Sequence, residues 1–143
     1  MAKKRLSRRI RDFVKERAHG YCEYCGHPEI YANQFYSIEH IIPLSKNGTN
    51  ELDNLAYSCQ PCNGHKYNKT RVLDPVSGQI VPLFNPRKHS WTAHFCWSED
   101  YLNIEGISAT GRATVKALEL NRKNLVNLRR ILFSFGEHPP QHL

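Results

Sequence analysis

The chain has 143 residues, of which 40% are hydrophobic and 23% charged, and its formal net charge is +7. These proportions exclude a broadly disordered chain, and the length suits one domain with a core rather than two. The sequence has no apolar run of the roughly 18 residues that a membrane span needs and no signal peptide, so we expect a soluble, cytoplasmic protein of the bacterial type.

The first predicted element is a basic helix that Ser7 can cap and Gly20 can end. Its apolar side comes from residues at helical spacing, Leu6, Ile10, Phe13 and Val14. A second basic group lies near the C-terminus and comprises Arg112, Lys116, Arg122, Lys123, Arg129 and Arg130. Both groups fit a polyanionic partner, although a solubilising surface explains a basic cluster equally well. In and around the first helix we expect nucleic-acid contacts from Arg5, Arg8, Arg9, Arg11 and Lys15, with Lys3 and Lys4 nearby.

Two Cys-x2-Cys pairs follow the helix, Cys22 with Cys25 and Cys59 with Cys62. Disulfides would suit a secreted protein, and a lone pair could be a redox site. Two pairs beside turn residues instead favour one shared structural zinc ion, because four thiolates satisfy its tetrahedral preference.

Between and after the cysteine pairs the pattern predicts a strand at residues 35–42, a polar loop at 45–50, a strand at 55–58 and a helix from 63 to about 69. The extension then has predicted strands at 79–84 and 102–107. Two helices follow, with Thr110 and Asn121 as their caps. We divide the chain into a core at 1–71 and an extension at 72–143 packed on it, and expect a frayed tail from about 137.

The first strand ends in Glu39 and His40, and Asn54 and Asn63 lie further along the core. A carboxylate, an imidazole and two carboxamides suit a hard divalent ion with an open position and a base beside it. His40 is the natural base, because a neutral imidazole is available near pH 7. Since neighbours on a strand point to opposite faces, Glu39 and His40 can share one phosphate only if the strand is distorted there.

Three motifs have fixed spacing: Glu-His-Ile-Ile-Pro-Leu-Ser at 39–45, Asn-Leu at 54–55 and Cys-x2-Cys-Asn-x2-Lys at 59–66. Together they strongly resemble the HNH endonuclease family in its four-cysteine zinc-knuckle subgroup, over about residues 21–70. The resemblance implies an α+β protein with a ββα-metal core and structural zinc. To that core the sequence adds the basic helix and a C-terminal extension of strands and two helices.

By the same resemblance, His40 is the general base, Asn54 braces the loop that orients it, and Glu39 and Asn63 hold the catalytic ion. That ion would be Mg²⁺ or another divalent ion such as Mn²⁺ or Ni²⁺. His65 is a rival ligand, or faces a phosphate or solvent, and Lys66 either contacts a phosphate or is solvated.

The implied reaction is hydrolysis of DNA phosphodiester bonds, leaving 5′-phosphate and 3′-hydroxyl ends. One such site cuts one strand, so double-strand cleavage needs a homodimer or two visits. Two alternatives stay open: a non-catalytic zinc-knuckle module that binds nucleic acid or protein, and the same nuclease chemistry acting on RNA or branched DNA.

Overall fold

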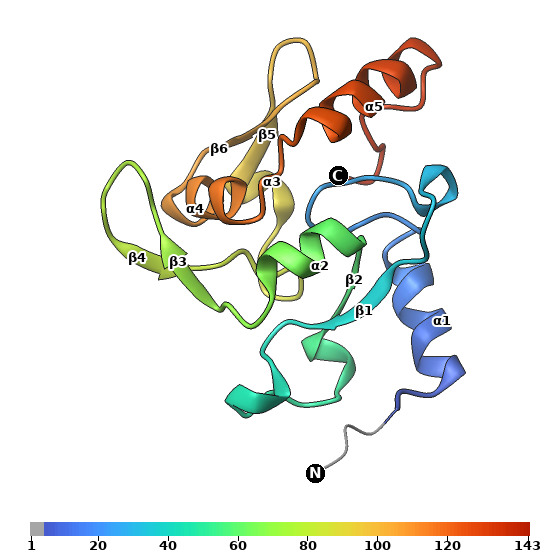
Figure 1. Cartoon of the computed structure of the whole chain (residues 1–143), viewed down its shortest axis with the longest axis vertical. Coiled ribbons are helices and arrows are strands. Elements are labelled where there is room, and N and C mark those ends of the chain that lie inside the picture. The colour runs from blue at the N-terminus through green and yellow to red at the C-terminus, as the bar shows by residue number, and fades with distance from the viewer. Residues whose placement is uncertain (1–4) are drawn as a thin grey trace.

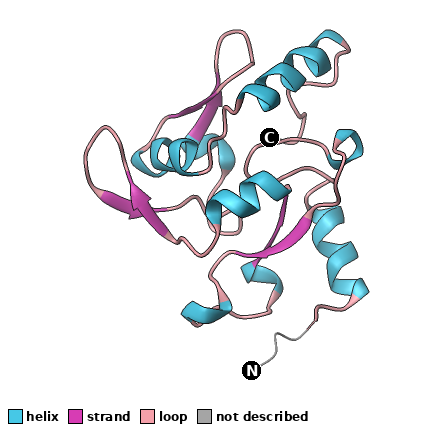
Figure 2. Ribbon diagram, in the orientation of Figure 1, coloured by secondary structure: helices cyan, strands magenta, loops and turns pink. Residues whose placement is uncertain are grey.

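A computed structural model describes residues 5–143, so Lys3 and Lys4 of the basic group lie outside the described residues. Figure 1 labels the elements, and Figure 2 distinguishes helices from strands. In chain order they are α1 (Arg8–Arg17), η1 (Glu29–Tyr31), β1 (Ser37–His40), η2 (Leu44–Lys46), η3 (Leu52–Asn54), β2 (Leu55–Ser58), α2 (Gln60–Lys66), β3 (Arg71–Leu73), β4 (Ile80–Pro82), α3 (Trp91–His94), β5 (Phe95–Trp97), β6 (Ile104–Gly106), α4 (Ala109–Ala117) and α5 (Lys123–Ser134).

The N-terminal half consists of α1, the β1–β2 hairpin and α2, which lie together in Figure 1. Ser7 caps α1 as predicted, because its hydroxyl accepts the Ile10 amide at 3.2 Å. Strands β1 and β2 are antiparallel, and α1 packs on β2 while α2 packs on β1. His40, the predicted base, therefore lies at the end of β1, and β2 leads directly into α2.

The end of β1 is regular, so the predicted distortion is wrong. Glu39 pairs with Ala56 and His40 with Leu55, one residue against one. The strand stops there because the Asn54 side chain replaces a strand partner, accepting the Ile42 amide at 2.9 Å and donating to the Ile42 carbonyl at 2.9 Å. Glu39 and His40 consequently keep the opposite directions of an ordinary strand.

The C-terminal half contains two further hairpins, β3–β4 and β5–β6, with α4 packed against both. The helix caps differ from the prediction: Ser108 caps α4 in place of Thr110, and Arg122 precedes α5 in place of Asn121. Asn121 instead bonds to both backbone groups of Ile104, at 2.7 and 2.9 Å. Its side chain therefore ties the α4–α5 connection to β6.

The predicted frayed tail is ordered and packed. His138 is buried, its Nε2 lies 2.7 Å from the Tyr101 carbonyl, and its ring meets Trp97 edge-on at 4.6 Å. Leu143 packs against the hydrophobic core. Proline-rich, polar residues look like a tail in sequence, but here they cover an aromatic surface of the extension.

Candidate metal centre and active site

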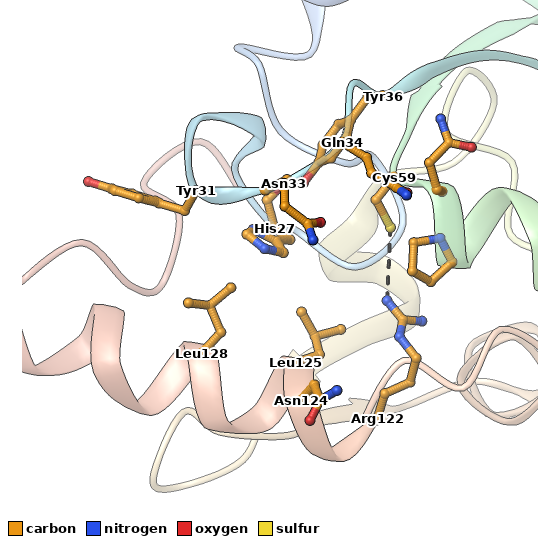
Figure 3. Close-up of a pocket in the computed structure, with 13 residues that line it drawn as sticks. His27, Tyr31, Asn33, Gln34, Tyr36, Cys59, Arg122, Asn124, Leu125 and Leu128 are labelled. Atoms are coloured by element: carbon orange, nitrogen blue, oxygen red, sulfur yellow. Dashed lines mark hydrogen bonds between the residues drawn. The ribbon is translucent and has the colours of Figure 1, made fainter.

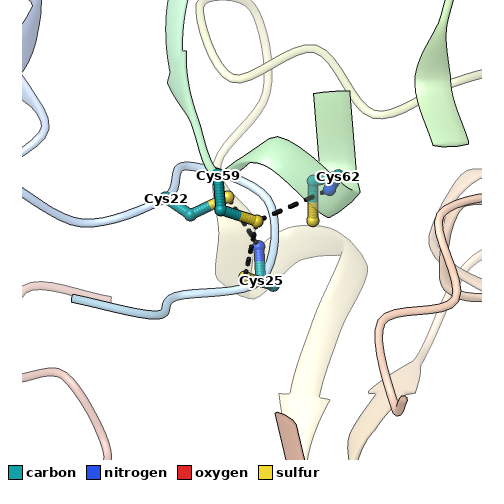
Figure 4. A group of neighbouring side chains, drawn as sticks. All are labelled: Cys22, Cys25, Cys59 and Cys62. Atoms are coloured by element: carbon teal, nitrogen blue, oxygen red, sulfur yellow. Dashed lines mark hydrogen bonds between the residues drawn. The ribbon is translucent and has the colours of Figure 1, made fainter. Parts of the chain in front are cut away.

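Four sulfur atoms meet beneath the hairpin, as Figure 4 shows. The ligand atoms of Cys22, Cys25, Cys59 and Cys62 all lie within 4.8 Å of one another, and all four residues are buried. A zinc–sulfur bond of about 2.3 Å places tetrahedral sulfurs about 3.8 Å apart. Cys25 Sγ and Cys59 Sγ are 3.8 Å apart. The donor set fits a structural zinc ion, as the sequence predicted.

Each pair is shaped by its own backbone. In the first, the Cys25 amide donates to Cys22 Sγ at 3.5 Å, and Gly26 closes the turn at a φ of 75°, which favours glycine. In the second, the Cys62 amide donates to Cys59 Sγ at 3.5 Å as Cys59 caps α2. Each knuckle thus aims two sulfurs at one point.

Glu39 lies in a buried ion pair, which the sequence did not predict. Its side chain is 3% exposed, and Oε1 contacts the Lys66 ammonium. Oε2 accepts the Tyr24 hydroxyl at 2.6 Å. The ammonium also donates to the Ile41 carbonyl at 2.8 Å and the His40 carbonyl at 3.3 Å. Both readings of Lys66, a phosphate contact and a solvated lysine, are therefore wrong, because this side chain is 1% exposed.

This ion pair bears directly on the predicted role of Glu39 as a metal ligand. Burial raises the pKa of Glu39, while Lys66 and the Tyr24 hydroxyl oppose that rise. As arranged, Glu39 has a cation against one oxygen and a hydroxyl against the other, so it is not a free carboxylate ligand. An ion bound there would have to share a carboxylate oxygen with one of these partners or displace it.

His40, the predicted base, is 9% exposed and ends β1. Its Nε2 lies 2.8 Å from Asn50 Oδ1. An amide oxygen can only accept, so this pairing places the ring proton on Nε2 and leaves the lone pair of Nδ1 available to take a proton. The arrangement suits a general base held in one tautomer.

Asn54 ties together the loop that follows His40. Besides its two bonds to Ile42, its amide nitrogen donates to the Thr49 carbonyl at 2.8 Å. The loop between β1 and β2 therefore has a fixed path, and that path carries Asn50 to the His40 ring.

The remaining candidate ligands both lie on α2. Asn63 is half-buried in α2, one turn before Lys66. His65 faces the C-terminal half, where its Nδ1 lies 3.1 Å from Glu119 Oε2. This contact engages Nδ1 of His65, and the role of His65 as a ligand or phosphate contact stays a prediction.

The two basic groups behave differently in the fold. The N-terminal group is exposed at Arg5, Arg8, Arg9, Arg11 and Lys15. Two of these have acidic neighbours: Arg8 lies 3.9 Å from Asp12, and Lys15 lies 2.9 Å from Glu29. In the C-terminal group, Arg112 is bound to Asp74 and both Arg122 and Arg129 turn inward. The expectation that this second group forms a nucleic-acid surface is wrong for these three.

A pocket of about 360 Å³ lies beside the cysteine cluster, between the residues after the first knuckle and α5 (Figure 3). Its lining includes His27, Tyr31, Tyr36, Arg122 and Leu125. Neither Glu39 nor His40 lines this pocket, so it is separate from the predicted active site.

Sequence reasoning missed several of these partners. Asn50 sits in a turn-rich loop with nothing to distinguish it from Asn47, and Tyr24 lies unremarked inside the first knuckle. Lys66 carried a usable signal: it falls four residues after Cys62 on one helix, so it had to lie on the same side as a buried cysteine.

The HNH endonuclease family model matches residues 22–69. No curated protein and no solved structure is significantly similar to the chain. No helix in residues 5–143 is both long and apolar enough to cross a membrane. The matched segment begins at the first knuckle and ends just after α2, so it spans the hairpin, His40 and all four cysteines. Residues 22–69 therefore match the HNH endonuclease family, and the four cysteines placed to bind one metal ion are consistent with its zinc-knuckle subgroup.

Proposed function

We propose that this protein is an endonuclease that hydrolyses DNA phosphodiester bonds. The observation that carries the proposal is the His40 ring, which the family match includes and which Asn50 orients with Nδ1 free. An imidazole in this state is the group that a hydrolase needs to deprotonate water near neutral pH.

In the proposed reaction, a water molecule lies between Nδ1 of His40 and the phosphorus atom. Nδ1 takes the proton while the new oxygen–phosphorus bond forms, and the bond from phosphorus to the 3′ oxygen breaks. The products are a 5′-phosphate and a 3′-hydroxyl, and the 3′ oxygen takes up a proton from solvent. The Nε2–H bond to Asn50 stabilises the imidazolium that forms in between.

We also propose that cleavage depends on a divalent ion such as Mg²⁺, Mn²⁺ or Ni²⁺, and only the family match supports this part of the proposal. A bound ion supplies Lewis acidity at the phosphate. The pairing of Glu39 with Lys66 argues against a preformed site, so the choice of ion is a matter for the assay.

The proposal of DNA as the substrate rests on the positive charge of the N-terminal basic group. Exposed arginines lie on α1 and, at Arg5, shortly before it, in the same half of the molecule as β1 and β2. Such a surface binds the phosphate backbone and carries little sequence information. Competition among duplex, branched and single-stranded DNA and RNA would separate DNA from the other nucleic acids.

The test is cleavage of supercoiled plasmid by zinc-loaded protein in a series of Mg²⁺, Mn²⁺ and Ni²⁺. We expect nicking by the wild type and its loss in His40→Ala. His89→Ala is the matched control, since this histidine belongs to the C-terminal half, where its Nδ1 accepts the Asn85 amide at 3.1 Å, and the variant should retain activity. Nicking by His40→Ala at the wild-type rate would refute the assigned base.

A non-catalytic zinc module is the second candidate, and one observation favours it: the family's acidic ligand position is already neutralised by Lys66. This candidate predicts that the zinc-loaded protein binds DNA but cuts it in none of the ions.

The same plasmid assay separates the two routes to double-strand cleavage. One site cuts one strand, so linear plasmid that appears only after the nicked form would indicate two visits. Linear plasmid that appears without the nicked form would indicate a homodimer.

A further inference from the structure

Two arginines of the C-terminal half converge on the four-cysteine cluster. Arg122, at the start of α5, reaches the sulfurs: Nη1 lies 3.7 Å from Cys62 Sγ and Nη2 lies 3.9 Å from Cys59 Sγ. Figure 3 shows the guanidinium aimed at Cys59. Arg129, two turns along α5, approaches from the other knuckle, and its Nη2 lies 3.4 Å from the Cys25 carbonyl.

Neither arginine has a carboxylate to pair with. Within residues 5–143, no Asp or Glu oxygen forms an ion pair with Arg122 or Arg129. Arg129 is only 3% exposed, and its buried Nε has no hydrogen-bond partner in that same part of the chain. Backbone carbonyls and the Trp97 ring, 5.2 Å from the guanidinium carbon, solvate the charge but do not neutralise it. A buried cation without an anion is strongly destabilising.

The cysteine cluster supplies the missing anion once it is loaded. Zn²⁺ with four thiolates carries a net charge of about −2, and the two guanidiniums together carry the opposite charge. We infer that Arg122 and Arg129 are the charge partners of the zinc tetrathiolate, so that zinc binding and docking of the C-terminal half stabilise each other. This coupling is independent of the proposed nuclease activity.

The physical reason for the coupling is reciprocal. Without zinc the centre is no longer a metal tetrathiolate, and buried Arg129 and half-buried Arg122 lose that charge partner, which weakens the docking of α5. Without the arginines, the excess negative charge of the loaded centre is uncompensated, which weakens zinc binding. By thermodynamic linkage, zinc strengthens the docking of α5 by the same free energy by which docking strengthens zinc binding.

The test measures zinc affinity in the full-length, zinc-loaded protein by competition with a coloured chelator. Arg122→Met should raise the zinc dissociation constant about 10- to 100-fold, the usual effect of losing a partner that bonds to metal ligands. Arg122→Lys keeps the positive charge and should lose clearly less zinc affinity than Arg122→Met. Arg130→Met is the control, because Arg130 lies on the same helix but is exposed, and within residues 5–143 its side chain bonds only to Asn127.

Hydrogen exchange supplies the second readout. In zinc-loaded Arg122→Met, amides of α5 should exchange faster than in wild type, while those of α1 should not. Three results would each overturn the inference. They are a wild-type zinc affinity in Arg122→Met, an equal loss of zinc affinity in Arg122→Met and Arg122→Lys, and a loss in Arg130→Met equal to that in Arg122→Met. Should Arg122→Met fail to fold with zinc while Arg122→Lys folds, the requirement for charge is demonstrated directly.

Discussion

Removing the Lys66 ammonium gives the sharpest test of how this core is held together. In Lys66→Met the Glu39 carboxylate stays buried with only the Tyr24 hydroxyl, and the carbonyls of His40 and Ile41 lose their donor. Breaking a buried ion pair by removing one partner costs about 3–5 kcal/mol. Because domains of this size are stable by about 5–15 kcal/mol, the variant should lose a large share of its free energy of unfolding.

The rise in the Glu39 pKa indicates that burial costs this carboxylate more than its partners return. Replacing both charges, in the double variant Glu39→Gln with Lys66→Met, should therefore recover most of the lost free energy of unfolding.

The pH dependence of the stability of Lys66→Met has a definite sign. Without Lys66 the folded-state pKa of Glu39 lies still further above its unfolded value, so the folded state binds the extra proton. Lys66→Met should consequently gain stability relative to wild type as pH falls.

Urea unfolding of the zinc-loaded proteins, followed by circular dichroism, measures these differences. Lys69→Met is the matched control, since this lysine is exposed on the turn after α2 and should change stability by less than about 0.5 kcal/mol. A Lys66→Met protein as stable as wild type at pH 7, or a double variant that loses as much as the single one, would refute the reasoning.

Three further outcomes follow from contacts elsewhere in the chain. Hydrogen bonds from Arg112 hold the pKa of Asp74 below its ordinary value of 3.8, so the stability that Asp74 contributes is complete above pH 3.8 and is lost at lower pH. The melting temperatures of wild type and Asp74→Asn should therefore differ most near pH 7 and converge in acid. A difference in melting temperature that stays constant with pH would contradict this. Asn54→Ala removes three backbone hydrogen bonds and should cost roughly 1–3 kcal/mol in urea unfolding, whereas an unchanged midpoint would show that water replaces them. Deleting residues 138–143 should lower the melting temperature and shift Trp97 fluorescence to the red, while a frayed tail would leave both unchanged.

Three arginines connect the C-terminal half to partners inside the fold. From the sequence it stays open whether this extension reads a nucleic-acid sequence, dimerises or buttresses the fold. Arg112, Arg122 and Arg129 are directed toward Asp74 or the cysteine cluster. These are three of the six basic residues of the C-terminal group, and the other three, Lys116, Lys123 and Arg130, are exposed.

Features that rest on local chemistry could be predicted from the sequence. The Cys-x2-Cys spacing predicts a pair of thiolates from each turn, Ser7 caps the helix that follows it, and two short strand-like runs separated by a polar, turn-rich loop predict the hairpin. The order of Glu39, His40, Asn54 and Asn63 along the chain likewise indicated the family.

Which buried charges meet follows from the tertiary structure. Lys66 and Glu39 are 27 residues apart, and Arg129 and Cys25 are separated by 104. Helical and strand periodicity tells which face a side chain takes, but not which distant element covers that face. For that reason a lysine expected in solvent is an internal counter-ion, arginines expected on DNA lie against sulfur and backbone, and a tail expected to fray covers Trp97.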